Sequence, residues 1–112
     1  MNDDTARELL AAERSRVQAL LDSARAAGRD DRGAASEQGD MTDPAPALVS
    51  EQVDDALAVE LSARLEAIAR AEQRLAAGTY GRSVRSGLAI SDDRLHADPA
   101  AELTIEEARH SA

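Results

Sequence analysis

The longest helical pattern in the sequence is residues 44–77, PAPALVSEQVDDALAVELSARLEAIARAEQRLAA. Its larger apolar residues recur at steps of three, four or seven positions: Val53, Leu57, Leu61, Leu65, Ile68 and Leu75. Such steps place side chains on one face of a helix, and the seven-residue spacing of Leu61, Ile68 and Leu75 is typical of a coiled-coil seam. The pattern predicts one long helix, about 50 Å in length at 1.5 Å per residue.

Both ends of this helix carry sequence signals. Asp43 can accept backbone amide hydrogen bonds as an N-cap, and Pro44 suits the first helical position, where its missing N–H needs no partner. At the other end, Gly78 can adopt the left-handed conformation that closes many helices. We therefore place the helix at residues 44–77.

A shorter helical pattern precedes it. Thr5 and Glu8 have the spacing of a capping box, in which each side chain bonds the other residue's backbone amide. The apolar face that follows consists of Leu10, Val17, Leu21 and Ala24. Gly28 ends the pattern, and the next residues are acidic, small or glycine. We predict a helix over residues 5–27 and an acidic tip loop over residues 28–43.

These elements predict a mostly α fold. Neither helix can bury its apolar face alone and the linker is short, so residues 1–77 are expected to form an antiparallel helical hairpin, a coiled coil. Residues 78–112 form a separate small module that is rich in glycine and serine at its start. The Asp98–Pro99 pair is expected to begin a short terminal helix. The module is too small to fold unaided, so we expect it to pack against the end of the hairpin.

The composition favours narrow helical seams and excludes several function classes. The chain has 112 residues, no Phe, Trp or Cys, and Tyr80 as its only aromatic residue. A net charge of −9 disfavours binding to nucleic-acid phosphates and to anionic membranes. No apolar run suits a signal peptide or a membrane span, and the absence of cysteine fits a cytoplasmic protein.

One stretch, residues 74–103, reads RLAAGTYGRSVRSGLAISDDRLHADPAAEL. It resembles the zinc-finger region of the TraR/DksA family of bacterial transcription factors. The positions that match the family pattern are Gly78, Tyr80, Gly81, Gly87, Ile90, Arg94, Leu95, Ala97, Pro99, Ala101 and Leu103. The resemblance implies a helical hairpin followed by a zinc-finger-like module at residues 78–112.

The four zinc-binding cysteines of the family are replaced, although their spacing is kept. Their positions hold Ser83, Ser86, Thr104 and Glu107. Because neutral hydroxyls do not replace thiolates, we predict that the zinc is lost while the fold remains, with no metal cofactor. The spacing of His96 and His110 matches no metal site. The side chains expected to compensate are Leu88, Ile90, Leu95, Leu103 and Ile105, packed against Tyr80 and Leu75.

The resemblance also assigns a partner-binding tip. Counted back from Ser83 without a gap, the family's D-x-x-D-x-A motif falls on Asp40, Asp43 and Ala45. In the family this tip enters the secondary channel of RNA polymerase and lies near the catalytic magnesium. A simpler interpretation stays open, in which Asp43 only caps a helix and Asp40 is one of several solvated acids.

Regulation by ppGpp is not expected. Family members that bind this alarmone together with polymerase use basic residues, and the corresponding positions here hold Ala67, Asp98 and Ala108. A polyanion needs cations at its site.

The sequence thus predicts a monomeric transcription regulator that binds RNA polymerase and has no DNA contact and no enzymatic activity. The sequence has no cysteine nucleophile, no Ser-His-Asp spacing, no glycine-rich phosphate-binding loop and no pocket-forming core. The main alternative is a structural or protein-interaction coiled coil that has lost polymerase binding. A hydrolase using Asp40 and Asp43 with Mg²⁺ would need at least one more ligand.

Overall fold

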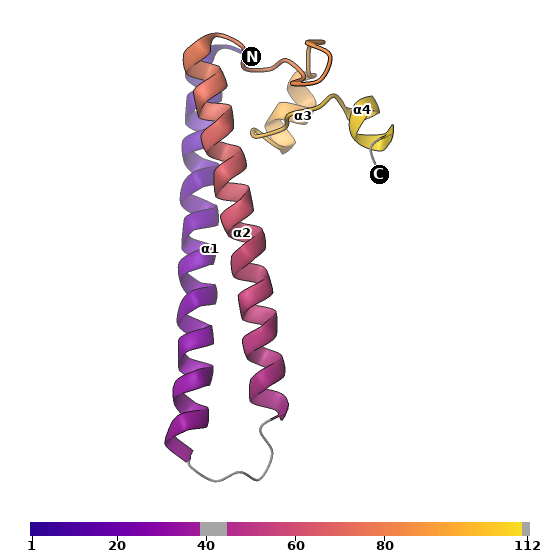
Figure 1. Ribbon diagram of the computed structural model, residues 1–112. Helices are drawn as coiled ribbons and strands as arrows, with labels where there is room; N and C mark the ends of the chain where they lie inside the picture. Colours follow the sequence, from indigo (N-terminus) through magenta and orange to yellow (C-terminus); the bar gives the residue numbers. More distant parts are fainter. Residues whose placement is uncertain (39–44, 111–112) are drawn as a thin grey trace. The chain divides into compact units, whose positions relative to one another are not determined.

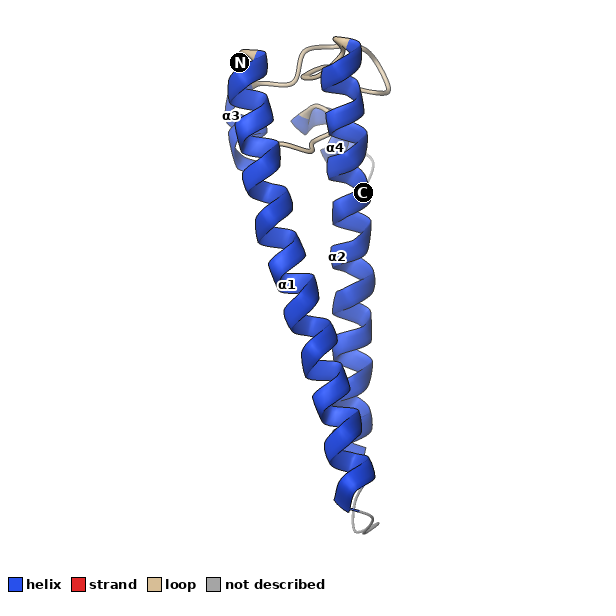
Figure 2. Ribbon diagram, turned by 90° about the vertical axis from the view of Figure 1, so that its left-hand side faces the viewer, coloured by secondary structure: helices blue, strands red, loops and turns tan. Residues whose placement is uncertain are grey.

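The computed structural model describes the backbone of residues 1–38 and 45–110, and the side chains of this set apart from residues 28–53. The chain is mostly helical, as predicted, with α1 at Asp3–Gln38, α2 at Ala45–Ala77, α3 at Asp92–Ala97 and α4 at Ile105–His110 (Figure 1). Within the described residues no strand is present (Figure 2), and the β pairing is limited to a bridge between Arg82 and Ala89. No described helix has the length and apolar character that a membrane span needs.

The chain divides into two compact units. The terminal unit consists of Met1–Ser15 and Glu66–Ala112, and the helix-pair unit is Arg16–Leu65. In the helix-pair unit, the predicted apolar face of α1 is confirmed, because Val17, Leu21 and Ala24 are buried. Leu57 of α2 is exposed, so it does not belong to the buried stripe.

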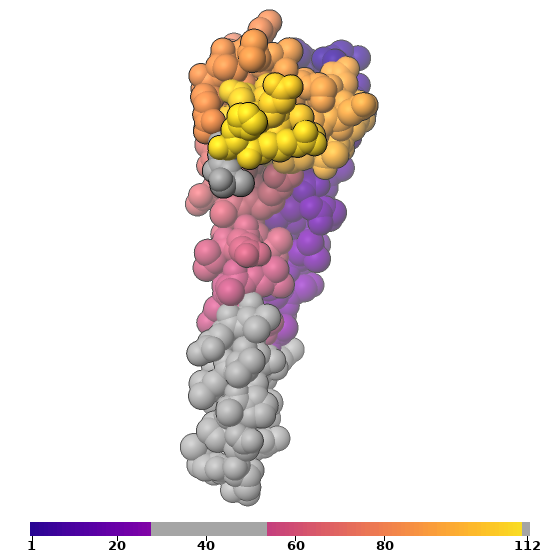
Figure 3. Space-filling model, turned by 90° about the vertical axis from the view of Figure 1, so that its right-hand side faces the viewer, coloured from indigo at the N-terminus to yellow at the C-terminus, as the bar shows by residue number. Residues whose placement is uncertain are grey.

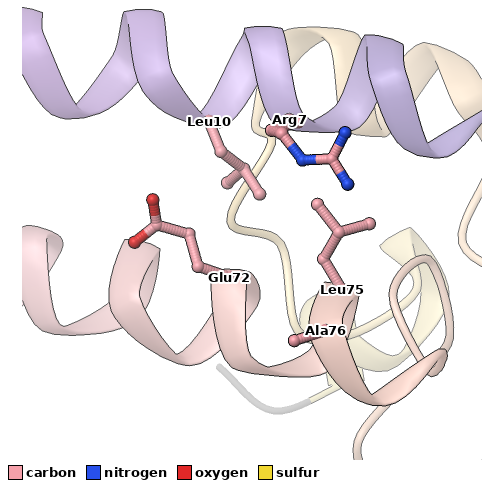
Figure 4. Close-up of a pocket in the computed structure, with 5 residues that line it drawn as sticks. All are labelled: Arg7, Leu10, Glu72, Leu75 and Ala76. Carbon is pink, nitrogen blue, oxygen red and sulfur yellow. The ribbon is translucent and has the colours of Figure 1, made fainter.

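α1 and α2 are antiparallel in the terminal unit. Arg14 of α1 forms an ion pair with Glu72 of α2. Nearer the start of α1, Arg7 and Leu10 line a small pocket with Leu75, which lies later in α2 (Figure 4). In this view the Leu10 and Leu75 side chains point toward one another, as the predicted seam requires.

α1 begins two residues before the predicted start. The Thr5 N–H donates to Asn2 Oδ1 at 2.7 Å, and the Ala6 N–H donates to the Asn2 carbonyl at 3.0 Å. Asn2 is therefore the N-cap, and the predicted capping role of Thr5 is wrong. Asparagine caps a helix as well as threonine does, and Asp3 and Asp4 then suit the first turn, where negative charge stabilises the helix dipole.

α1 also ends later than predicted. It continues through Gly28 to Gln38, so the tip loop predicted for residues 28–43 is wrong over residues 28–38. A glycine inside a helix costs only about 1 kcal/mol relative to alanine, and this segment also contains good helix formers such as arginine, alanine, glutamate and glutamine. Residues 39–44, which include the predicted cap Asp43 and Pro44, lie outside the described residues.

α2 ends where the sequence predicts. Gly78 has a φ of +80°, in the left-handed region. Its N–H donates to the Leu75 carbonyl at 3.3 Å, and the Thr79 N–H donates to the Arg74 carbonyl at 2.9 Å. This pair of bonds is a Schellman motif, which satisfies two of the free carbonyls of the helix end.

The finger-like module, residues 78–110, has its own small core. Ile90, Leu95 and Ala101 are buried together, and Tyr80 packs against them. The Tyr80 hydroxyl donates to the Pro99 carbonyl at 2.8 Å, and burial raises the pKa of this phenol. Two of the residues predicted to join this core do not, because Leu88 is 63% exposed and Ile105 is 48% exposed.

Asp98 and Pro99 do not start the terminal helix, contrary to prediction. The Asp98 side chain and its carbonyl accept the N–H groups of Ala100 and Ala101, at 3.2 and 3.0 Å, and close a turn. The terminal helix is instead α4, which starts at Ile105. The preceding helix α3 was not predicted, and Ser91 caps it by accepting the Arg94 N–H.

Candidate functional site

The first pair of replaced cysteine positions lies in a tight turn. The Ser83 N–H donates to the Leu88 carbonyl at 2.8 Å, and the Gly87 N–H donates to the Ser83 carbonyl at 2.9 Å. Gly87 has a φ of +76°, which a residue with a side chain rarely adopts. Ser83 is buried, with 5% of its surface exposed.

The hydroxyl oxygens of this turn accept backbone hydrogen bonds. Ser83 Oγ accepts the N–H groups of Arg85 and Ser86, at 3.1 and 3.2 Å. Ser86 Oγ accepts the Leu88 N–H at 3.2 Å. Since a hydroxyl can accept and donate at the same time, each serine still has its own O–H proton to donate.

The second pair lies at the start of α4 and forms a reciprocal capping box. The Thr104 N–H donates to Glu107 Oε1 at 3.0 Å, and the Glu107 N–H donates to Thr104 Oγ1 at 3.2 Å. This box was not predicted, although the Thr-x-x-Glu spacing of residues 104–107 is its sequence signature.

The two pairs meet at the Glu107 carboxylate. The Thr104 N–H donates to this carboxylate at 3.0 Å, and the hydroxyls of Ser83 and Ser86 lie within hydrogen-bonding reach of it. The segments around residues 80–90 and 100–110 lie side by side in Figure 3, and the Val84 N–H donates to the Glu102 carbonyl at 2.9 Å. The four predicted positions are therefore brought together. We refer to Ser83, Ser86, Thr104 and Glu107 as the oxygen cluster.

Hydrogen bonds to the charged form of Glu107 lower the pKa of its carboxyl group. The Thr104 backbone amide, followed by the Ser83 hydroxyl, lowers the pKa of Glu107 to about 2, against an ordinary value of 4.5. Partial burial opposes this shift but does not cancel it. The carboxylate therefore stays ionised at acid pH values that would protonate an ordinary glutamate.

The donor set of the oxygen cluster does not fit zinc. Structural zinc sites use cysteine thiolates and histidine nitrogens, whereas these positions offer three neutral hydroxyls and one carboxylate. Both acceptor positions of Ser83 Oγ are already occupied by backbone amides. Across the described part of the chain, no group of three or more His, Cys, Asp or Glu residues could hold a metal ion.

Ion pairs join the finger-like module to the long helices within the terminal unit. The Glu102 carboxylate accepts a hydrogen bond from the Arg70 guanidinium at 2.8 Å, and it lies 3.8 Å from the Arg74 guanidinium. Both arginines are on α2. The Met1 amine lies 3.0 Å from Asp92 at the start of α3. Exposed pairs contribute little individually. Together they show that, within the terminal unit, the module packs against the last turns of α2 and the start of the chain.

The predicted partner-binding residues are only in part within the described set. Asp40 and Asp43 lie outside it. Ala45 is the first residue of α2, and its side chain is not among those described. The tip assignment therefore stays a prediction.

Comparisons with known proteins place the fold. No family model and no curated protein matches the sequence. Among solved structures, "Structure of transcription factor DksA2 from Pseudomonas aeruginosa" is similar, with a TM-score of 0.83 and 29% sequence identity. The match covers 97% of this chain and 81% of that one. The chain has a DksA/TraR-like fold. At the four positions where the family's zinc finger has its cysteines, this chain has the oxygen cluster.

The depressed pKa of Glu107 predicts an acid-sensitive module. Because the folded-state pKa lies below the ordinary value of 4.5, the stabilisation by Glu107 is fully present above pH 4.5 and is lost as the pH falls toward 2. Urea unfolding at pH 6, 4 and 3, followed by Tyr80 fluorescence, measures this loss. We expect the difference between the wild type and Glu107→Gln to shrink over that range. A difference that stays constant would contradict the prediction.

Proposed function

We propose that this protein is a transcription regulator that binds RNA polymerase through the secondary channel. The observation that carries the proposal is the likeness to DksA2, which is named a transcription factor and matches 97% of this chain. The family-specific run at residues 74–103 supports it independently. In this proposal the protein is cytoplasmic, acts as a monomer, and regulates without catalysing a reaction.

The hairpin tip is the proposed effector. Asp40, Asp43 and Ala45 are in register with the family's tip motif, counted without a gap from Ser83 through α2. Two carboxylates near the catalytic magnesium of polymerase can reorganise arginine and lysine contacts and metal-bound water. This chemistry changes the stability of initiation complexes and needs no bond-making step by the regulator.

The charge of the chain supports binding to polymerase without binding to DNA. A net charge of −9 repels the phosphate backbone, whereas DNA-binding modules present basic patches. An acidic tip is suited instead to a protein channel in which arginines, lysines and the catalytic magnesium create positive potential.

We further propose that ppGpp does not act through this protein. Ala67 lies on α2 and Ala108 on α4, and neither carries a charge. Asp98, at the third position, is acidic and is used in a turn. Anionic phosphates would be less favourable there because these three positions supply no cation.

Competition for polymerase tests the proposal. We expect the purified protein to displace a fluorescently labelled Gre-type factor from core RNA polymerase at concentrations on the order of tens of micromolar or lower. The double variant Asp40→Asn/Asp43→Asn should keep its affinity within about threefold, because asparagine keeps the size of aspartate and the proposal gives these carboxylates an effector role rather than an anchoring one. It should nevertheless lose its effect on transcription in vitro.

The matched control is Asp30→Asn/Asp31→Asn. It removes the same two charges from the neighbouring part of the chain. We expect this variant to bind and to act like the wild type. If the wild type does not displace the labelled Gre-type factor from core RNA polymerase, the polymerase proposal fails. The remaining hypothesis is then a helical protein-interaction protein. Equal loss of activity in both double variants would refute the assignment of the tip.

A further inference from the structure

The oxygen cluster connects two segments that are otherwise separate in the sequence. Ser83 and Ser86 belong to the turn after α2, and Thr104 and Glu107 begin α4. The serine oxygens accept backbone N–H groups, the serine hydroxyls lie within hydrogen-bonding reach of the Glu107 carboxylate, and Thr104 closes the capping box with Glu107.

A carboxylate has the geometry for this central position. It has two oxygens with about four acceptor sites, so it can bind two hydroxyls and a backbone amide at the same time. Hydrogen bonds to a charged acceptor are roughly twice as strong as those between neutral groups. Glutamine would keep the shape of the side chain but would lose the charge and half of the acceptor capacity.

We propose that the Glu107 carboxylate holds together the two segments that a zinc ion joins in the metal-containing finger, so that this module folds without metal. Glu107 is the central acceptor, and Ser83, Ser86 and Thr104 are its donors. The proposal concerns how the module folds, and it stands whether or not the protein binds polymerase.

A narrower role for Glu107 must be distinguished from this one. As a capping-box residue alone, Glu107 would stabilise only α4 through Thr104. The two roles differ in whether Glu107 is coupled to the serine turn. A double-mutant cycle between Ser86→Ala and Glu107→Gln measures that coupling directly.

The first experiment is urea unfolding of the full chain, followed by Tyr80 fluorescence. We expect Glu107→Gln to lower the midpoint by about 1 M, through loss of charge-assisted bonds. Glu106→Gln is the matched control, because Glu106 is the neighbouring exposed acid in the same first turn of α4, and its midpoint should not move. A chelator should leave the wild-type midpoint unchanged.

Three results would overturn the proposal. The first is equal midpoints for Glu107→Gln and Glu106→Gln. The second is a cycle with Ser86→Ala that shows no coupling, which would leave only the cap of α4. The third is a drop in the wild-type midpoint in chelator, or stoichiometric zinc in the purified protein.

A gain-of-function variant tests the geometry even if Glu107→Gln does not fold. If the four side chains converge, S83C/S86C/T104C/E107C should bind one Co²⁺ per chain under reducing conditions, with the charge-transfer absorption of a tetrahedral thiolate site. Its midpoint should then fall in chelator, unlike that of the wild type. Failure to bind Co²⁺ stoichiometrically would show that the positions do not converge, and would refute the proposal.

Discussion

Replacing Ile68 with alanine is expected to lower the free energy of unfolding by about 3 kcal/mol. Ile68 lies on α2 in the terminal unit and is fully buried, as is Leu10 on α1. In a chain without phenylalanine or tryptophan, few side chains bury as much apolar area as this isoleucine. Truncation removes that area and leaves a cavity, and both effects destabilise the folded state.

Chemical denaturation followed by far-ultraviolet circular dichroism measures the loss at Ile68. The matched control is Val59→Ala, a β-branched residue on the same helix that is 69% exposed. We expect the control to change the free energy of unfolding by less than about 0.5 kcal/mol. If Ile68→Ala changed the free energy of unfolding as little as Val59→Ala does, the burial of Ile68 in the terminal unit would be contradicted.

Replacing Leu95 with alanine is expected to cost about 2–4 kcal/mol, and the loss should centre on the finger-like module. Leu95 is 2% exposed and packs with Ile90 and Ala101. Its Cδ1 would lie 3.7 Å from a Cβ added at Gly81, so the turn at Gly81 lies directly on this leucine. With so small a core, no other side chain can fill the space.

Tyr80 fluorescence reports this second loss, because Tyr80 packs against the cluster that contains Leu95. Leu88→Ala is the control, since Leu88 lies in the same module and is largely exposed. The control should unfold at the same urea concentration as the wild type. An equal effect of the two substitutions would mean that Ile90, Leu95 and Ala101 do not form the stabilising core.

The long helices could be predicted because apolar residues repeat at helical spacing along them, and because glycine is the residue type that suits a left-handed helix cap. Val17 and Leu21 repeat at helical spacing, and both are buried. Gly78 is a residue type suited to a left-handed cap and does adopt that conformation. The end of α1 could not be predicted in the same way. Gly28 has the same residue type as Gly78, but its modest cost in a helix is outweighed by its neighbours.

For the candidate site, the resemblance to the family's zinc finger was enough to predict that Ser83 and Glu107 lie close together, but not to show what joins them. A serine in a sequence does not reveal whether its hydroxyl meets water, backbone or a carboxylate, because that depends on the folded positions of residues more than twenty apart. The local pairing of Thr104 with Glu107 was readable as a capping box. The Asp98–Pro99 pair shows the opposite case, in which a valid start signal served a turn instead.

The oxygen cluster has a chemical consequence for the durability of the module. Zinc-finger thiolates are targets for peroxide and for alkylating reagents, which convert sulfur to forms that no longer bind metal. This chain contains no cysteine, and hydroxyl and carboxylate oxygens do not undergo that oxidation. The junction between the serine turn and α4 is therefore expected to survive oxidants that would dismantle a sulfur-ligated finger.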